Sequence, residues 1–291
     1  MSAVLAIDLG GTRCRIGIAD AGDPSGVRLV DDIAAPRTRT EFLGLVRQHV
    51  DAHGAACLGL GIPGLAQGSV CRWVPNLPFL DGLDLSEMLP GLQIGLGNDA
   101  QLSLLAEVQA GAAQGLADAV LLAIGTGIGS AVLASGVIVA GHQGGACSFG
   151  WASADPADAG DQVSGWLERQ ASGRALDAMA LGQGLASGQE LIAAARGGDA
   201  RALAALERPL AALGSAIGAA VALLDPAAII IAGGVTRALD VLGPGLRHAV
   251  DRHLPPHLRG VALVAAQHGS GAGLVGAAYA GAAGPDWRRT R

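Results

Sequence analysis

Asp8-Leu9-Gly10-Gly11-Thr12 follows the apolar run at residues 4–7, and Gly125-Thr126-Gly127-Ile128-Gly129 follows the apolar run at residues 119–124. Another apolar segment comes after each glycine-rich stretch, so each predicts a strand, a tight turn and a second strand. Turns of Gly and Thr direct backbone N–H groups and a hydroxyl into a concavity that suits phosphate oxygens. One such turn is common. Here two such turns lie one domain apart, and the first opens with Asp. Together they indicate a phosphotransferase that holds a nucleotide between two lobes.

The composition indicates a globular chain with two domains. The 291 residues are 51% hydrophobic and 15% charged, which allows a large core and argues against disorder. The net charge of −6 provides no basic surface, so we expect neither nucleic acid nor a membrane as a partner. All 19 basic residues are arginine. Without lysine the chain cannot be a P-loop kinase or a protein kinase, since both need one.

The cysteines and the longest apolar stretch indicate a cytoplasmic protein. Cys14, Cys57, Cys71 and Cys147 show neither a CxxC pair nor zinc-ligand spacing, so we expect reduced thiols. We expect no targeting leader, because the chain opens directly on a strand ending in Asp8. The uncharged apolar stretch at residues 209–224 is shorter than the roughly 20 residues that cross a bilayer, and it predicts a buried core helix.

The hydrophobic pattern predicts an α/β fold made of two ribonuclease-H-like, actin/hexokinase-like lobes with mixed sheets flanked by helices and a ligand cleft between them. The small lobe spans residues 1–97 and is completed by the C-terminal segment 271–291; the large lobe spans residues 98–270. Strands are predicted at 4–8, 15–19, 27–33, 57–62, 94–96, 119–124, 130–134, 137–140, 228–232 and 261–265. Helices are predicted at 41–52 (capped by Thr40), 100–113, 165–179, 188–196, 199–224 and 271–282.

The ordered motifs of the chain resemble those of the ROK family (repressors, open reading frames and sugar kinases), within the actin/hexokinase/Hsp70 superfamily. The matching segments are Asp8–Thr12, Gly61-Ile62-Pro63-Gly64, Val74-Pro75-Asn76-Leu77-Pro78, Asn98-Asp99-Ala100, Gly125–Gly129, Leu167-Glu168 with Ala171-Ser172-Gly173, and Asp225-Pro226 with Ile230–Val235. The resemblance covers nearly the whole chain. Because the chain opens on the phosphate-turn strand and not on a winged helix, the resemblance implies the kinase branch.

The resemblance implies that Asp99 is the general base, which orients a sugar hydroxyl and accepts its proton. The alternative is that Asp99 merely caps the helix at 100–113. Asn98 would hold neighbouring hydroxyls, or it is a structural asparagine. Gly64, Asn76, Ser148, Trp151 and Glu168 complete the implied sugar site. For Glu168 the alternative is a carboxylate that favours a helix N-terminus.

For the nucleotide, the resemblance implies ATP and Mg²⁺ as cofactors. Asp8 would hold Mg²⁺ through water, since Mg²⁺ keeps much of its hydration shell; the alternative is a turn aspartate that bonds to nearby amides. The residues implied to line the triphosphate are Gly10, Gly11, Thr12, Arg13, Gly125, Thr126 and Gly127. Gly233 and Gly234 would let the backbone approach adenosine closely, or they form an ordinary turn.

The chain departs from the family pattern in two places. The zinc-ligand positions of zinc-containing members are Trp151, Ala159, Asp161 and Trp166 here, so we expect no structural zinc. We expect Trp151, Trp166 or both to fill the volume by apolar packing. Ser148 stands where relatives carry a sugar-binding Glu. The acceptor is therefore a hexose bound more weakly, or a sugar modified near the anomeric end, on which Trp151 could stack.

The sequence thus predicts an ATP-dependent kinase that phosphorylates a sugar primary hydroxyl, the 6-position of a hexose or hexosamine, as in a glucokinase. The alternatives are a kinase for a modified or amino sugar in a biosynthetic pathway, and a catalytically weak sugar-binding sensor of the same fold. Polyphosphate as the donor is a further alternative, although the sequence shows no extended basic groove for it. The family resemblance also implies a homodimer.

Overall fold

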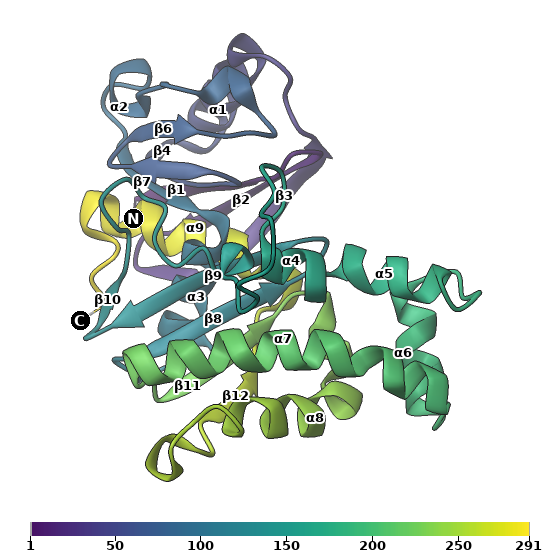
Figure 1. The fold of residues 1–291 in the computed structure, drawn as a ribbon. Coiled ribbons are helices and arrows are strands. Elements are labelled where there is room, and N and C mark those ends of the chain that lie inside the picture. The colour runs from purple at the N-terminus through teal and green to yellow at the C-terminus, as the bar shows by residue number, and fades with distance from the viewer. Residues whose placement is uncertain (1, 291) are drawn as a thin grey trace. The chain divides into compact units, whose positions relative to one another are not determined.

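The computed structural model describes residues 2–290, which form two units (Figure 1). Unit 1 contains the described chain up to Gly115, Ser135–Ala146, and the chain from Gln267 onward; unit 2 contains Leu116–Ala134 and Cys147–Ala266. This division differs from the boundary expected between residues 97 and 98, because the helix after Asn98 packs on the C-terminal helix and so belongs to unit 1. Residue 291 of the expected C-terminal segment lies outside the described residues.

Unit 1 is built on a mixed five-stranded sheet with the order β3-β2-β1-β4-β7. Its strands are β1 (Ala3–Leu9), β2 (Arg13–Asp20), β3 (Asp23–Ala34), β4 (Ala55–Ile62) and β7 (Gln93–Asn98). β1 runs antiparallel to β2 and parallel to β4, and β4 runs parallel to β7. The central strands are apolar and buried on both faces, as strands covered by helices on both sides must be.

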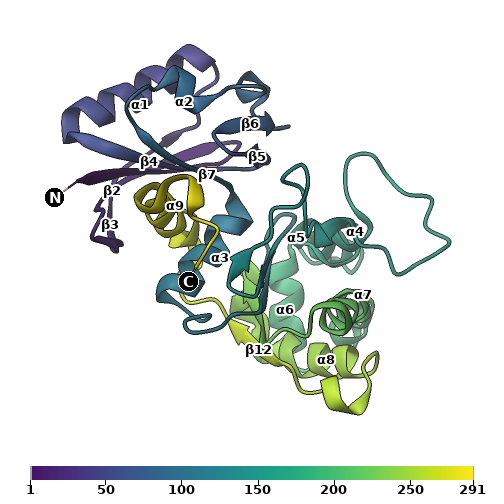
Figure 2. The same cartoon turned by 90° about the vertical axis from the view of Figure 1, so that its left-hand side faces the viewer.

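Helices cover both faces of this sheet (Figure 2). α1 (Arg39–His53) lies on one face and α9 (Ala272–Ala283) on the other, where it contacts β1, β4 and β7, as predicted for the C-terminal helix. The expected cap Thr40 is wrong: Thr38 caps α1 by accepting a hydrogen bond from Glu41 N at 3.2 Å. Glu41 in turn accepts from Arg37 N at 2.8 Å, so its spacing from Thr38 decides where the helix begins.

Glycines let α9 approach its neighbours closely. A Cβ atom on Gly59 of β4 would lie 1.7 Å from the Ala277 carbonyl oxygen of α9, and one on Gly95 of β7 would lie 2.0 Å from that of Ala280. On the helix itself, a Cβ on Gly276 would lie 1.9 Å from the Leu102 carbonyl oxygen of α3 (Asp99–Ala110). These contacts are backbone against backbone, so no side-chain rotation can relieve an added methyl group.

Short elements complete unit 1. They are β5 (Leu65–Gln67), β6 (Val70–Trp73), η1 (Pro78–Leu80), α2 (Leu85–Met88), β10 (Val137–Ile138), η5 (Gly269–Gly271) and η6 (Gly284–Asp286). β10 is shorter than the strand predicted at 137–140. The fully buried Trp287 donates its indole N–H to the Leu96 carbonyl at 3.0 Å, which fixes the end of the chain against β7.

Unit 2 repeats the strand pattern of unit 1. β8 (Ala119–Ile124) runs antiparallel to β9 (Ile128–Ala134) and parallel to β11 (Ala228–Ala232), which runs parallel to β12 (Ala262–Ala265). Its helices are η2 (Phe149–Trp151), α4 (Trp166–Ala171), α5 (Gly173–Leu181), α6 (Gly188–Arg196), α7 (Ala200–Leu224), η3 (Gly234–Ala238), α8 (Leu239–Asp251) and η4 (Pro256–Leu258). The two units therefore share a strand topology, in agreement with the two lobes of one kind predicted from the sequence.

Two helical predictions have different outcomes. The single helix expected at 165–179 is wrong, because Ser172 interrupts it and caps α5 by accepting from Ala175 N at 3.3 Å. α7 is present where a core helix was predicted. It is long and apolar enough to cross a membrane by length and composition, but 56% of its most apolar window is buried in the structure, against α4, α6 and α8 (Figure 1). We therefore interpret α7 as a core helix.

The close packing of α9 predicts that an added methyl group at Gly276 destabilises the protein. Gly276→Ala should lower the free energy of unfolding by about 1–3 kcal/mol, because the new methyl group has to push the α3 backbone away. Gly44→Ala is the matched control, since Gly44 lies inside α1 with open space around it, and it should raise stability by about 0.5–1 kcal/mol. Urea unfolding of both variants measures the difference. Equal stability of Gly276→Ala and wild type would contradict the packing described here.

Candidate functional site

In unit 1, residues predicted to bind the sugar or Mg²⁺ lie where the parallel strands β1, β4 and β7 end. In register, Asp8 of β1 lies beside Gly61 of β4, and Ile62 of β4 lies beside Asn98 of β7. Asn98 caps α3 by accepting from Ala100 N at 3.0 Å, and its side-chain amide donates to the Gly64 carbonyl at 3.2 Å. The sheet thus brings residues from widely separated parts of the sequence to one edge.

Asp99 is not the cap of α3. It occupies the first helical position, where its carboxylate accepts from Ala100 N at 2.7 Å, while Asn98 takes the capping role. The residue as a whole is exposed, while protein atoms nearby desolvate its carboxyl group. This desolvation, with the nearby Asp8 charge, raises the pKa of Asp99 to about 6, against the lowering effect of hydrogen bonds from Ala100 and Asn98.

Asp8 has an arginine neighbour that the sequence analysis missed. Burial raises the pKa of Asp8, and the Arg15 guanidinium, 3.9 Å from its carboxylate, opposes that rise. Arg15 also donates to the Ser270 carbonyl at 2.8 Å, which fixes its side chain. The signal was available in the sequence, because counting the antiparallel register back from the glycine turn places Arg15 directly opposite Asp8.

The first glycine turn is exposed and closes with a hydrogen bond from Gly10 N to the Arg13 carbonyl at 2.8 Å. Asn76 packs on it, since a Cβ on Gly11 would lie 3.0 Å from the Asn76 Cβ atom. The Arg13 side chain turns to Asp32, with 2.8 Å between Nε and the carboxylate. The Arg13 side chain is therefore already paired with Asp32, whereas Gly11 and Thr12 of the turn are exposed to solvent.

In unit 2 the second glycine turn is tied to the start of α5. Gly173 N donates to the Gly125 carbonyl at 2.7 Å, and the Arg174 guanidinium donates to the Thr126 carbonyl at 3.3 Å. Glu168 of α4 reaches the same turn. One of its carboxylate oxygens lies 3.4 Å from Ile128 N and the other 2.8 Å from the Arg174 guanidinium. Both predicted participants, Thr126 and Glu168, thus lie at this turn.

A pocket of about 350 Å³ opens beside the second glycine turn. The end of β8, the faces of α5 and α6, and η3 line it. Its apolar side chains include Leu176, Ile192 and Val235, and its polar ones are Gln189, Arg196 and Arg237. Gly125 and Gly234 line it as well. Gly233 lies at the strand end with φ 81°, and a Cβ there would lie 2.4 Å from the Ile124 carbonyl oxygen, so only glycine fits.

The helical wall of this pocket was not predicted from the sequence. Gln189 and Ile192 are three residues apart on α6 and so share one face of the helix. The same spacing is also typical of a helix face that packs on the core. Arg196, on the same face, is held by Asp240 at 2.6 Å. Only the packing of α6 against its neighbours distinguishes a pocket wall from a buried stripe.

The segment after Cys147 decides against only one of the two tryptophans expected to pack there. Trp151 is 52% exposed, so it does not fill the volume of the missing zinc ligands by apolar packing, while Trp166 is half-buried. Ser148 is exposed. Among the side chains that the structure describes, no group of three or more His, Cys, Asp and Glu is arranged to hold a metal ion. Polar contacts hold this segment instead.

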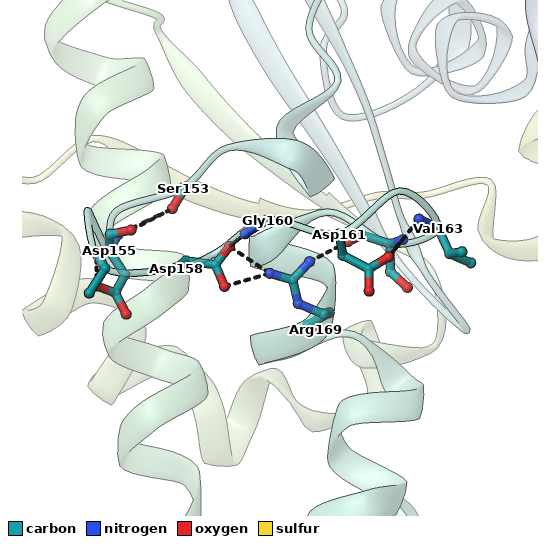
Figure 3. A network of polar contacts seen from close by, with 9 residues as sticks. Ser153, Asp155, Asp158, Gly160, Asp161, Val163 and Arg169 are labelled. Carbon is teal, nitrogen blue, oxygen red and sulfur yellow. Dashed lines mark hydrogen bonds and ion pairs between the residues drawn. The ribbon is translucent and has the colours of Figure 1, made fainter.

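Figure 3 shows those contacts. Both carboxylate oxygens of Asp158 accept from one guanidinium nitrogen of Arg169, at 2.7 and 2.6 Å, and another nitrogen of Arg169 donates to the Ser164 carbonyl. Asp161 accepts from Val163 N at 2.5 Å and from Ser164 N at 3.0 Å. The Arg169–Asp158 pair is only 26% and 23% exposed, so water screens it weakly. An ion pair from α4 therefore fastens the loop at residues 152–165.

A model of the ROK family matches residues 4–282. The chain belongs to the ROK family. It is 28% identical to the glucokinase of Thermotoga maritima, over 94% of this chain and 96% of the relative. It is 27% identical to the N-acetyl-D-glucosamine kinase of Yersinia enterocolitica, over 94% and 97%. A ROK glucokinase from Streptomyces griseus, solved with glucose and AMPPNP, matches with a TM-score of 0.73 and 26% identity over 95% and 98% of the two chains.

The role of the Arg169–Asp158 ion pair of this ROK protein can be tested by removing the pair. Arg169→Gln should speed proteolytic cleavage within residues 152–165 and lower the free energy of unfolding by about 1 kcal/mol, because a partly buried charged hydrogen bond is lost. Limited proteolysis with mass spectrometry locates the cuts. The exposed pair Arg196–Asp240 provides the control, since Asp240→Asn should leave cleavage of this loop unchanged. A loop cut at the wild-type rate in Arg169→Gln would contradict the role of the ion pair.

Proposed function

We infer that this ROK-family chain is an ATP-dependent sugar kinase. The observation that carries this inference is Asp99, a carboxylate of raised pKa beside Asn98, at the strand-end edge that Asp8 shares. A carboxylate placed this way suits the proton transfer of phosphorylation. The full-length match to relatives named as glucokinase and N-acetyl-D-glucosamine kinase supports the same chemistry.

Asp99 acts as the general base in the proposed reaction. It accepts the proton of the acceptor hydroxyl as that oxygen attacks the terminal phosphorus of ATP, and the bond from this phosphorus to the bridging oxygen of ADP breaks. Capping by Asn98 fixes the backbone from which Asp99 projects. Gly64, Asn76 and Asn98, all in unit 1, orient the hydroxyls of the sugar.

The pocket of unit 2 suits a nucleoside. Its volume and apolar walls fit an adenine with its ribose, and Gly233 and Gly234 bring the backbone close to the ligand. The glycine turns that begin at Gly10 and Gly125 offer amides to the phosphates. Arg13 as a phosphate ligand stays a prediction, because Asp32 holds its side chain.

Asp8 is the residue that would hold Mg²⁺. The residues present fit the ion, because Asp8 and Asp99 lie close enough for one negative charge to raise the pKa of the other, a repulsion that a divalent cation relieves. When bound, Mg²⁺ neutralises charge on the phosphates. The Arg15 guanidinium, 3.9 Å from the Asp8 carboxylate, favours the ionised form of Asp8. No zinc role is proposed for the segment around Trp151.

The acceptor is proposed to be a hexose or hexosamine phosphorylated on its primary 6-hydroxyl. Ser148 supplies no charge to the sugar, and the half-exposed Trp151 offers an aromatic face for stacking, which suits a ring modified near its anomeric end. Glu168 as a sugar ligand stays a prediction. ADP release over a panel of hexoses, amino sugars and N-acylated sugars tests the choice. A homodimer and a cytoplasmic location also remain predictions.

Removing the base should abolish turnover. Asp99→Asn should lower kcat by about 10²–10⁴-fold, because the amide cannot accept the hydroxyl proton, while sugar binding measured by calorimetry is largely kept. Asp51→Asn, an exposed change on α1, serves as the control and should retain wild-type rates. Wild-type turnover in Asp99→Asn would overturn the assignment. Sugar binding by a wild-type protein that releases no ADP would favour the sensor alternative.

The raised pKa of Asp99 predicts an acid limb in the pH profile. The base works only when ionised, so kcat/KM should fall as the pH drops through about 6 and approach a tenfold loss per pH unit below it. An ordinary aspartate would stay ionised to about pH 4. Initial rates between pH 5 and 8 measure the limb, with circular dichroism to show that the protein stays folded. A flat profile down to pH 5 would contradict the shift.

A further inference from the structure

A negative charge lies at the second glycine turn. One carboxylate oxygen of Glu168 is 3.4 Å from Ile128 N, and a Cβ atom on Gly127 would lie 2.9 Å from it. Amides of glycine-rich turns are anion sites. The carboxylate therefore occupies part of the turn to which the proposed function assigns the phosphates of ATP, and like charges so close together repel strongly.

Arg174 is placed to offset this repulsion. Its guanidinium lies 2.8 Å from the other carboxylate oxygen of Glu168 and 3.3 Å from the Thr126 carbonyl. The Arg174 side chain is 64% exposed, whereas that of Glu168 is only 19% exposed. The cation is thus anchored on the turn and still has donors directed to solvent, because a guanidinium carries five N–H groups.

Two other arginines of unit 2, Arg169 on α4 and Arg196 at the pocket beside the turn, are already engaged. Arg169 is paired with Asp158, and Arg196 with Asp240. The chain contains no lysine that could take their place. The Arg174 guanidinium contacts both the Thr126 carbonyl and the Glu168 carboxylate.

We propose that Arg174 binds the polyphosphate of the nucleotide and neutralises Glu168 at the same time. The proposal rests on the proposed function, since it assumes that the second glycine turn receives phosphates. In the nucleotide complex the guanidinium is shared between the carboxylate and the phosphate oxygens. Without Arg174, the Glu168 charge faces the phosphates uncompensated, so the loss should exceed that of a single contact.

A double-mutant cycle tests this charge compensation. The probe is AMPPNP with Mg²⁺, titrated calorimetrically into wild type, Arg174→Gln, Glu168→Gln and the double variant, without sugar. Arg174→Gln should weaken binding about tenfold or more, whereas Glu168→Gln should leave it unchanged or tighter. The double variant should recover part of the affinity that Arg174→Gln loses, because the repelling charge is gone, and should stay weaker than Glu168→Gln, because the contact between Arg174 and phosphate is missing.

Two further variants serve as controls. Arg208→Gln, an exposed change on α7, should bind as wild type does, and Arg174→Lys should keep most of the affinity through its charge. Wild-type affinity in Arg174→Gln overturns the proposal, and so does a double variant as weak as Arg174→Gln. If wild type binds AMPPNP and also releases ADP from ATP when a sugar is present, either of these contrary affinities removes only this inference. If wild type does neither, the proposed function fails and the inference fails with it.

Discussion

The distance between α9 and the sheet of unit 1 is the constraint on which the site of that unit depends. Gly59 and Gly95 remove side chains from the strands, and Gly276 removes one from the helix, so backbones meet directly. The same helix passes over the end of β1, where a Cβ on Gly273 would lie 2.8 Å from the Asp8 carboxyl carbon. Close packing of small residues therefore desolvates Asp8 and sets the electrostatics of the strand ends.

This arrangement has a consequence for the carboxylates. Parallel strands bring Asp8 and Asp99 to one edge of the sheet. Burial raises the pKa of both carboxyl groups, and the charge of Asp8 raises that of Asp99 further. Arg15 offsets part of that rise at Asp8. In unit 2 the analogous balance is between Glu168 and Arg174. Both units thus place a carboxylate and an arginine close to a glycine turn.

Local patterns predicted the fold well where apolar period and turn residues agreed. The helix Gly188–Arg196 and the strand Ala228–Ala232 have the predicted bounds, and the α/β class is confirmed. Errors arose where two nearby residues could fill the same role. For example, Thr38 and not Thr40 caps α1. The unit boundary was missed because the packing of α3 on α9 joins residues about 170 apart, which no local pattern encodes.

The sequence by itself determined the two glycine turns, the aspartates that follow their strands, and membership of the ROK family, because these depend on residue order and strand alternation. Only the tertiary structure decided which charges meet. It turned Arg13 to Asp32, placed Arg15 beside Asp8, and fastened the loop near Trp151 with Arg169. Long flexible side chains form ion pairs with the charged groups that lie within reach in the folded chain. Packing sets those distances, and spacing along the sequence does not.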